Sequence, residues 1–429
     1  MKLEEAVKYA SDLLLSLPRK KKVRIIGHVD ADGIASASIV AISLARAGYR
    51  FHVSIKKTEA NLIKEIEKEE NDLIIFADIG SSYLKEMEKL KSNVIVLEHH
   101  LHEGEIPNNV IYVNARMHGI DGSREACGAS VAYAFAIAID SENKDLCQLA
   151  VPGIIGDKQS FTGWNKKIIE DGIGNGFIEE REEYIMGDKN LRDFLENSIE
   201  PYFTGFRSSS LFLDEIGIPP QKKFDEIDET KRKKLLSLLT IKLIEQGVED
   251  IEWKKIFYYG EKYGNLFDLA SKLNACARFN ESGTGISLCF GDQRAFEKAK
   301  FIQEKYRDEI RKEMRELEMK EPNERENFIY FYVDKPSLAG VLAGLALKYL
   351  PQFRKGKPVF ALSHNDYVDI SARADEKMVE NGINLGKAIK NVAEKIGGIG
   401  GGHPIAAGGK IKKSFEEKFL EEIDKELKK

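Results

Sequence analysis

Histidine and aspartate residues are concentrated in a few short segments of this sequence. The first segment contains His28, Asp30 and Asp32 and follows the β-branched run 22–26. One imidazole and two carboxylates at this spacing offer the nitrogen and oxygen ligands that divalent cations prefer. The alternative interpretation is a surface turn, because Asp-x-Asp-Gly is also a common turn sequence.

Further acidic and histidine residues follow other apolar runs. Asp78 ends one such run, Glu98-His99-His100 ends another, and Asp157 follows the pair of helical stretches 125–140 and 145–156. The carboxyl ends of parallel strands line one edge of a sheet, so we expect these residues to meet there. Taken alone, Asp78 is more often a turn or helix-cap residue, a His-His pair more often has a structural role, and Asp157 is more often a turn residue. The residues expected to converge are His28, Asp30, Asp32, Asp78, His99 and Asp157.

That donor set predicts a particular chemistry. Four carboxylates and two imidazoles are enough ligands for two divalent cations. Two such ions can share a carboxylate, activate a water and stabilise both oxygens of an in-line displacement at phosphorus.

The spacing of apolar runs predicts the fold that positions these residues. Strands alternating with helices are typical of a parallel, doubly wound α/β sheet. The predicted strands are 22–27, 51–56, 72–77, 93–98 and 110–114. The predicted helices are 3–17, 34–47, 59–69, 82–90, 125–140 and 145–156.

A second, smaller α/β unit is expected at the C-terminus. Its predicted strands are 328–333, 358–363 and 367–372, and its predicted helices are 337–349 and 384–396. Since 429 residues exceed one ordinary core, several domains are expected. We expect a metal-site domain (1–160), a mostly helical region (161–292), a connector helix (293–325) and the C-terminal domain (326–429).

The composition limits the class of protein. A formal net charge of −5 argues against a chain that is basic throughout, while a local basic channel remains compatible with it. The four cysteines form no Cys-x-x-Cys pair, which favours reduced core thiols in a cytoplasmic protein. No run of about 18 apolar residues occurs, so no membrane-spanning segment is expected.

Taken together, the motifs resemble the DHH phosphoesterase superfamily. The likeness is greatest to its archaeal RecJ-like branch, which includes the nuclease associated with the GINS replication complex. The matching segments are His-x-Asp-x-Asp-Gly at 28–33, Asp78, the triplet 98–100, Gly-Asp-Lys-Gln at 156–159, Asn-Ala-Cys-Ala-Arg at 274–278, and the glycine run with His-Pro at 400–404.

The resemblance implies a two-metal phosphodiesterase with Mn²⁺ or Mg²⁺. A metal-bound hydroxide would then be the nucleophile. The implied ligands form two sets that share Asp78: His28, Asp30 and Asp78 for one ion, and Asp32, Asp78, His99 and Asp157 for the other.

The triplet departs from the family pattern at one position. Glu98 stands where the family has aspartate, and the resemblance places His100 beside the scissile phosphate. If Glu98 only orients the histidines, the change is expected to be tolerated. If Glu98 touches a metal or the water, activity is expected to fall.

The C-terminal segment resembles the DHH-associated domain, which implies contacts with substrate. The alternatives are a flexible turn for the glycine run, a surface salt bridge for Arg373, and a structural role for Asn274 and Arg278. The implied substrate-binding residues are Ser371, Arg373, Gly400, Gly401, Gly402, His403, Asn274 and Arg278.

The resemblance implies a single-stranded nucleic-acid exonuclease of DNA replication or repair. It favours 5′-to-3′ cleavage of single-stranded DNA or RNA, with GINS and the replicative helicase as further partners. Two alternatives stay open. One is a phosphodiesterase for short oligonucleotides or cyclic dinucleotides, and the other is a weakly active or inactive scaffold that binds GINS.

Overall fold

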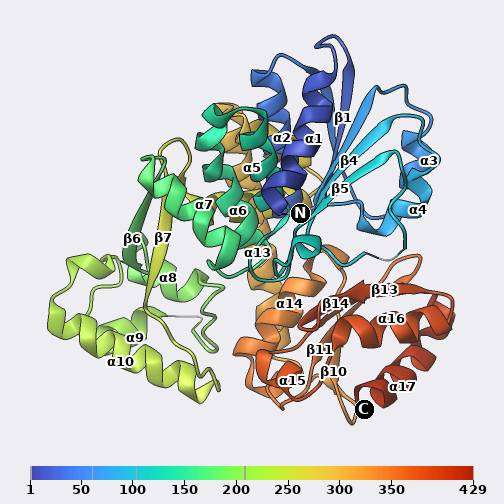
Figure 1. Cartoon of the computed structure of the whole chain (residues 1–429). Helices are drawn as coiled ribbons and strands as arrows, with labels where there is room; N and C mark the ends of the chain where they lie inside the picture. Colours follow the sequence, from blue (N-terminus) through green and yellow to red (C-terminus); the bar gives the residue numbers. More distant parts are fainter. Residues whose placement is uncertain (1, 60, 103, 207–208, 429) are drawn as a thin grey trace. The chain divides into compact units, whose positions relative to one another are not determined.

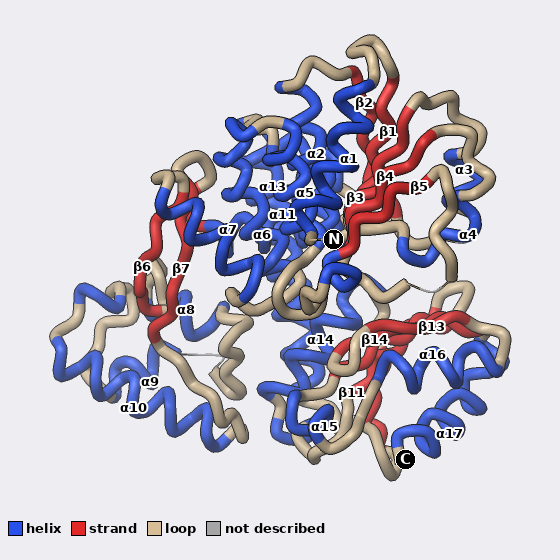
Figure 2. Tube along the Cα trace, viewed as in Figure 1, coloured by secondary structure: helices blue, strands red, loops and turns tan. Residues whose placement is uncertain are grey.

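A parallel sheet lies at the centre of the N-terminal part of the chain. Its strands have the spatial order β2-β1-β3-β4-β5, and every neighbouring pair is parallel. Figure 2 shows these strands in red. They are β1 (Lys22–His28), β2 (Arg50–Lys56), β3 (Leu73–Ala77), β4 (Asn93–Glu98) and β5 (Val110–Asn114). The predicted doubly wound α/β fold is therefore confirmed.

Helices cover both faces of this sheet (Figure 1). Buried side chains of β1, β3 and β4 pack on one face against α3 (Leu62–Ile66) and α4 (Leu84–Met87). Both helices are shorter than predicted. The other face carries α1 (Leu3–Ser16), α2 (Ala31–Arg46) and α5 (Gly128–Ile139), and α6 (Cys147–Gly156) packs against α2 and α5.

The middle of the chain is mostly helical, as expected, but it also contains a small sheet of order β6-β7-β8. Its first strand has the sequence Ile-Glu-Glu-Arg-Glu-Glu-Tyr, which lacks the apolar alternation that identifies strands. The elements are α7 (Gly163–Gly174), β6 (Ile178–Tyr184), α8 (Leu191–Asn197), α9 (Ser209–Glu215), α10 (Glu229–Glu245), β7 (Lys254–Gly260), β8 (Gly264–Asn265), α11 (Leu266–Arg278), α12 (Ser282–Cys289) and the long α13 (Gln293–Glu318).

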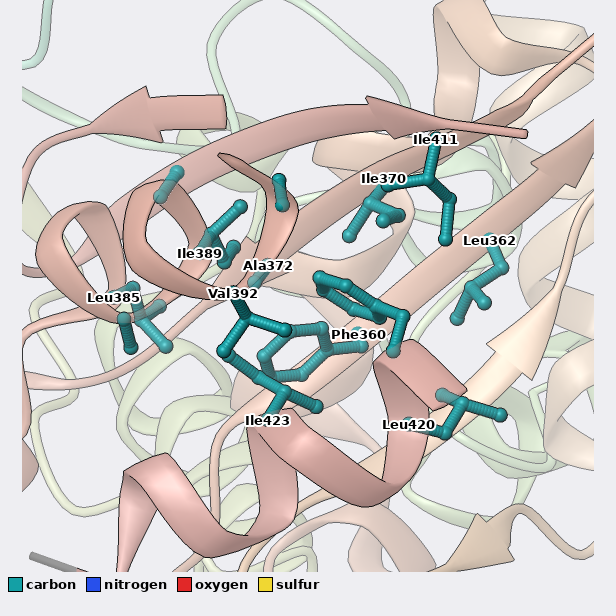
Figure 3. Close-up of a cluster of buried hydrophobic side chains, with 14 of the residues drawn as sticks. Phe360, Leu362, Ile370, Ala372, Leu385, Ile389, Val392, Ile411, Leu420 and Ile423 are labelled. Carbon is teal, nitrogen blue, oxygen red and sulfur yellow. The ribbon is translucent and has the colours of Figure 1, made fainter. Parts of the chain in front are cut away.

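A second, mixed sheet forms the C-terminal part, in the order β13-β14-β12-β11-β10-β9. Its strands are β9 (Asn323–Glu324), β10 (Ile329–Tyr332), β11 (Val359–His364), β12 (Val368–Arg373), β13 (Ile399–Gly402) and β14 (Ala406–Ile411). The helices are α14 (Pro336–Tyr349), α15 (Glu376–Glu380), α16 (Leu385–Lys395) and α17 (Glu416–Leu427). Figure 3 shows the core between the sheet and the last two of them.

This computed structural model describes residues 2–59, 61–102, 104–206 and 209–428. The chain divides into two compact units. One unit joins Met1–Glu182 with Ile256–Glu304, and the other joins Glu183–Lys255 with Lys305–Lys429. Within the described ranges, every helix is too short or too polar to cross a bilayer.

Candidate metal centre

The carboxyl ends of three adjacent strands carry most of the residues selected from the sequence. In the sheet, β1 lies next to β3, and β3 lies next to β4. Side chains that follow these strands therefore meet at one edge, and the ends of α2, α5 and α6 complete the site. The residues brought together are His28, Asp30, Asp32, Asp78, His99, His100 and Asp157.

A first group of ligand atoms comes from His28, Asp30 and Asp78. Nδ1 of His28 lies 2.7 Å from Oδ2 of Asp30 and 3.8 Å from Oδ2 of Asp78. Asp30 also caps α2, because its Oδ1 accepts the N–H of Gly33 at 2.8 Å. One oxygen of Asp30 is thus fixed by the helix, while the other faces the group.

A second group surrounds His99. Its Nε2 lies 3.1 Å from Oδ1 of Asp78, 3.3 Å from Oδ2 of Asp157 and 3.8 Å from Oδ2 of Asp32. Asp78, His99 and His100 form a further group whose ligand atoms lie close enough together to bind one metal ion. Asp78 thus directs Oδ2 to the first group and Oδ1 to the second, which suits a carboxylate shared by two ions.

The buried Asp32 is held by the first turn of α5. Its two oxygens accept the backbone N–H groups of Gly128 at 2.7 Å and Ala129 at 2.8 Å. A Cβ at Gly128 would lie 2.4 Å from Cβ of Asp78, and one at Gly153 of α6 would lie 2.5 Å from Oδ1 of Asp32. Glycine at positions 128 and 153 therefore lets α5 and α6 approach the carboxylates closely. Nothing in the sequence alone indicated this role for the two glycines.

The ring of His99 is oriented by a backbone carbonyl. Its Nδ1 lies 2.5 Å from the carbonyl oxygen of Gly122, to which Gln159 also donates at 3.1 Å. A carbonyl oxygen can only accept, so Nδ1 carries a proton and Nε2 is the ring nitrogen directed towards the carboxylates. This second hydrogen bond is typical of a metal-binding histidine.

The buried carboxylates repel one another, and a bound cation would relieve this repulsion. Burial raises the pKa of Asp78 well above its usual range, and the charges of Asp32, Asp30 and Asp157 raise it further. Burial also raises the pKa of Asp157, and the charges of Asp32 and Asp30 raise it further. Burial also acts to raise the pKa of Asp30, but the nearby His28 outweighs it and holds that pKa low. Because a divalent cation would neutralise this repulsion, the donor set fits Mn²⁺ or Mg²⁺.

The backbone of Asp78 adopts a left-handed conformation, with φ of 62°. Non-glycine residues enter this region uncommonly, and they concentrate there at functional sites. The conformation turns the chain directly after β3, where the carboxylate takes its place between the two ligand groups. Lys158, which follows Asp157, has a positive φ of 55° as well.

Glu98 orients the two histidines that follow it. Its Oε2 accepts the backbone N–H groups of His99 at 2.9 Å and His100 at 3.1 Å, and lies 2.9 Å from Nδ1 of His100. Its Oε1 accepts the N–H of Ser81 at 3.2 Å. Burial opposes ionisation, but His100 and these hydrogen bonds hold the pKa of Glu98 well below its usual range. Among the described residues, the candidate metal groups do not include Glu98.

Replacing Glu98 by alanine is expected to leave Mn²⁺ binding largely intact while lowering the turnover number about 10- to 100-fold, as found for supporting residues around metals. The reason is that His100 loses the acceptor that fixes its ring. Calorimetric titration with Mn²⁺ beside steady-state kinetics separates the two effects. Loss of both Mn²⁺ sites in Glu98→Ala would show that the glutamate is a ligand.

Two candidate substrate residues lie on α11 in the same unit. Arg278 is exposed at the last position of this helix, and Asn274 is half-buried one turn earlier. Burial acts to raise the pKa of Asp30, and the charge of His28 lowers it. The charge of Arg278 also lowers the pKa of Asp30. The positive side chain of Arg278 thus lies near enough to Asp30 to stabilise its charged form.

The candidate residues of the C-terminal unit lie on three adjacent strands. Ser371 of β12 is paired with Gly408 of β14, which is paired with Gly401 of β13. Paired residues share one face of a sheet, so the three form a row. A Cβ at Gly401 would meet no described atom within 4 Å, whereas one at Gly400 would lie 2.8 Å from Cγ2 of Ile389 in α16.

The glycine run therefore has two roles that alternate along β13. Gly400 permits close packing of α16, and Gly401 leaves bare backbone on the opposite face. Gly402 has a positive φ of 133°, and His403 follows it in the hairpin that joins β13 to β14. The turn considered for this run is thus confined to the hairpin tip, since residues 399–402 form a strand.

Two family models match the sequence, one at each end. The DHH family N-terminal domain matches residues 22–154, and the DHHA1 domain matches residues 325–429. The chain is 30% identical over 417 residues to an uncharacterised protein of Methanocaldococcus jannaschii, a match that covers 94% of this chain and 92% of that protein.

RecJ of Thermus thermophilus, named a single-stranded-DNA-specific exonuclease, is 27% identical over 172 residues. That match covers 37% of this chain and only 26% of RecJ. The structure of the same RecJ with Mn²⁺ superposes with a TM-score of 0.65 at 19% identity, covering 99% of this chain and 55% of RecJ.

CDC45 of Entamoeba histolytica gives the same TM-score of 0.65 at 12% identity, covering 100% of this chain and 98% of CDC45. At these identities the two superpositions establish a common fold. With both family models matched and one relative aligned over nearly its whole length, the chain belongs to the DHH superfamily as a RecJ-like protein.

Proposed function

We propose that this protein is an Mn²⁺- or Mg²⁺-dependent phosphodiesterase that degrades single-stranded DNA or RNA from one end. The superfamily points to a metal-dependent hydrolase. The observation that carries the proposal is the position of Asp78, whose two oxygens face two separate groups of ligand atoms.

Different side chains of the centre would bind the metal ions and the phosphate. Asp78 and the two ligand groups around it would hold the cations. When bound, a pair of divalent cations supplies an activated water and stabilises both oxygens of an in-line displacement at phosphorus. His100, fixed by Glu98 and partly exposed, is placed to donate to a phosphate oxygen, and Arg278 attracts the anionic strand.

The assay that tests the proposal uses single strands of DNA and RNA labelled at either end, with Mn²⁺. Release of mononucleotides from one labelled end gives the polarity, and we expect 5′-to-3′ cleavage. A strong preference for di- and trinucleotides over long strands would favour the short-oligonucleotide phosphodiesterase instead. No cleavage of any strand with either metal would favour a scaffold, for which binding of GINS or the helicase is then the measurement.

The row of Gly401, Gly408 and Ser371 supports a contact with the substrate backbone. Gly401→Ala is expected to leave the melting temperature nearly unchanged, because its Cβ points into open space. It is expected to raise KM for single strands on the order of 5- to 10-fold by obstructing the bare backbone.

The control is Gly400→Ala on the same strand. Its Cβ would meet Ile389, so this variant is expected to lose stability, on the order of 1–3 kcal/mol, in thermal unfolding. An unchanged KM in Gly401→Ala would show that substrate does not approach β13.

A further inference from the structure

The guanidinium of Arg373 lies against a gap in the surface of α14. A Cβ built at Gly340 would lie 2.6 Å from Nη2 of Arg373 and 3.4 Å from its Cζ. On the opposite side, Nη1 of Arg373 donates to the carbonyl oxygen of Ala372 at 2.8 Å. The planar end of the side chain is therefore held between the backbone of β12 and the bare turn of a helix.

Arg373 and Ser371 lie on the same face of the sheet. Side chains alternate along a strand, and Val368, Ile370 and Ala372 of β12 belong to the core beneath α16 and α17 (Figure 3). Ser371 and Arg373 consequently face the other way, towards α14. The gap at Gly340 thus sets where the guanidinium lies relative to the row that contains Ser371.

Helix stability does not explain glycine at position 340. Glycine in a helix interior costs about 1 kcal/mol relative to alanine. Position 340 lies within α14, where the preceding Ala339 is buried and Gly340 itself is half-buried. Outside the backbone of α14, the three atoms nearest to a Cβ at position 340 all belong to the end of the Arg373 side chain, which is flexible and can move away.

We propose that Gly340 is a positioning residue, which fixes the guanidinium of Arg373 in the pose that binds a phosphate of the nucleic-acid strand. This inference rests on the proposed function, because it takes Arg373 to be a phosphate contact. A guanidinium presents its donors as a planar fork, so its orientation determines how many of them reach one phosphate.

The test measures binding of the full chain to a fluorescein-labelled oligothymidylate in EDTA, where no strand is cleaved. Arg373→Ala is expected to weaken binding on the order of 10-fold and to reduce the salt dependence by about one phosphate contact. Gly340→Ala is expected to weaken binding on the order of 5-fold while the melting temperature stays equal or rises. Added to Arg373→Ala, it is expected to weaken binding no further.

Gly344 provides the matched control, one helical turn later. A Cβ there would lie 3.8 Å from Cγ of Arg373, an ordinary contact, so Gly344→Ala gains the same helix propensity without moving the guanidinium. We expect its binding to equal that of the wild type.

The other possible outcomes distinguish failure of the positioning role of Gly340 from failure of the proposed function. Unchanged binding in Gly340→Ala, or an equal loss in the presence and absence of Arg373, contradicts the positioning role and leaves the proposed function standing. Failure of the wild type both to bind a strand in EDTA and to cleave one with Mn²⁺ contradicts the proposed function instead. A crystal structure of Gly340→Ala then decides the positioning role alone, because an undisplaced Arg373 side chain would refute it.

Discussion

Replacing Asp78 by alanine is expected to lower Mn²⁺-dependent cleavage of single strands by a factor of at least about 10³. The side chain lies between two groups of ligand atoms, 3.8 Å from Nδ1 of His28 and 3.1 Å from Nε2 of His99. Its removal deprives both prospective metal sites of an oxygen, so neither site is complete. The measurement is release of label from end-labelled DNA under single-turnover conditions.

The control for this variant lies at the opposite end of the same strand. Asp72 precedes β3 and accepts from Lys21 at 2.7 Å, remote from the metal groups. Asp72→Ala is expected to cleave at the wild-type rate. Asp78→Asn serves as a second variant, because asparagine tolerates the left-handed backbone at this position better than alanine does. Normal cleavage by both Asp78 variants would contradict the bridging role.

Mn²⁺ is expected to raise the melting temperature of the wild type substantially and that of Asp78→Asn little or not at all. Without metal, burial and the charges of Asp32 and Asp30 raise the pKa of Asp78, so its ionisation destabilises the folded chain. Each unit of that increase corresponds to about 1.4 kcal/mol. Metal-free Asp78→Asn is therefore expected to be more stable than the metal-free wild type at neutral pH.

The pH dependence follows from the sign of the same pKa shift. A carboxyl whose pKa is raised on folding stabilises the folded chain while it is protonated. That contribution is lost as the pH rises from the usual value of 3.8 through the raised pKa. The stability advantage of metal-free Asp78→Asn should hence grow with pH over this interval, as thermal unfolding would measure. An advantage that shrinks with pH would contradict the repulsion inferred here.

The sequence predicted the parallel sheet because its strand-like apolar runs alternate with helical stretches, a pattern typical of such a sheet. It also predicted that Asp78 and His99 would meet, because strand ends of a parallel sheet share one edge. The motifs at the site are local, and the topology that joins them follows from alternation of strands and helices.

What the sequence did not show depends on contacts between distant segments. Gly128 at the start of α5 and Gly153 inside α6 have no recognisable signal, since glycine in a helix has many uses, yet each lies against a carboxylate of the centre. The orienting role of Glu98 likewise required the positions of four donors. Strand β6 escaped prediction because its charged side chains are mostly exposed and carry no apolar period.

The left-handed backbone at Asp78 limits how this position can change during evolution. Aspartate and asparagine accept a φ of 62° more readily than most residues do, and glycine accepts it without strain. In relatives that are no longer selected for hydrolytic activity, position 78 should therefore change first to asparagine or glycine. β-branched residues should be rare at this position. The signature of a lost activity would then be a small, specific set of replacements at one strand end, accompanied by an intact fold.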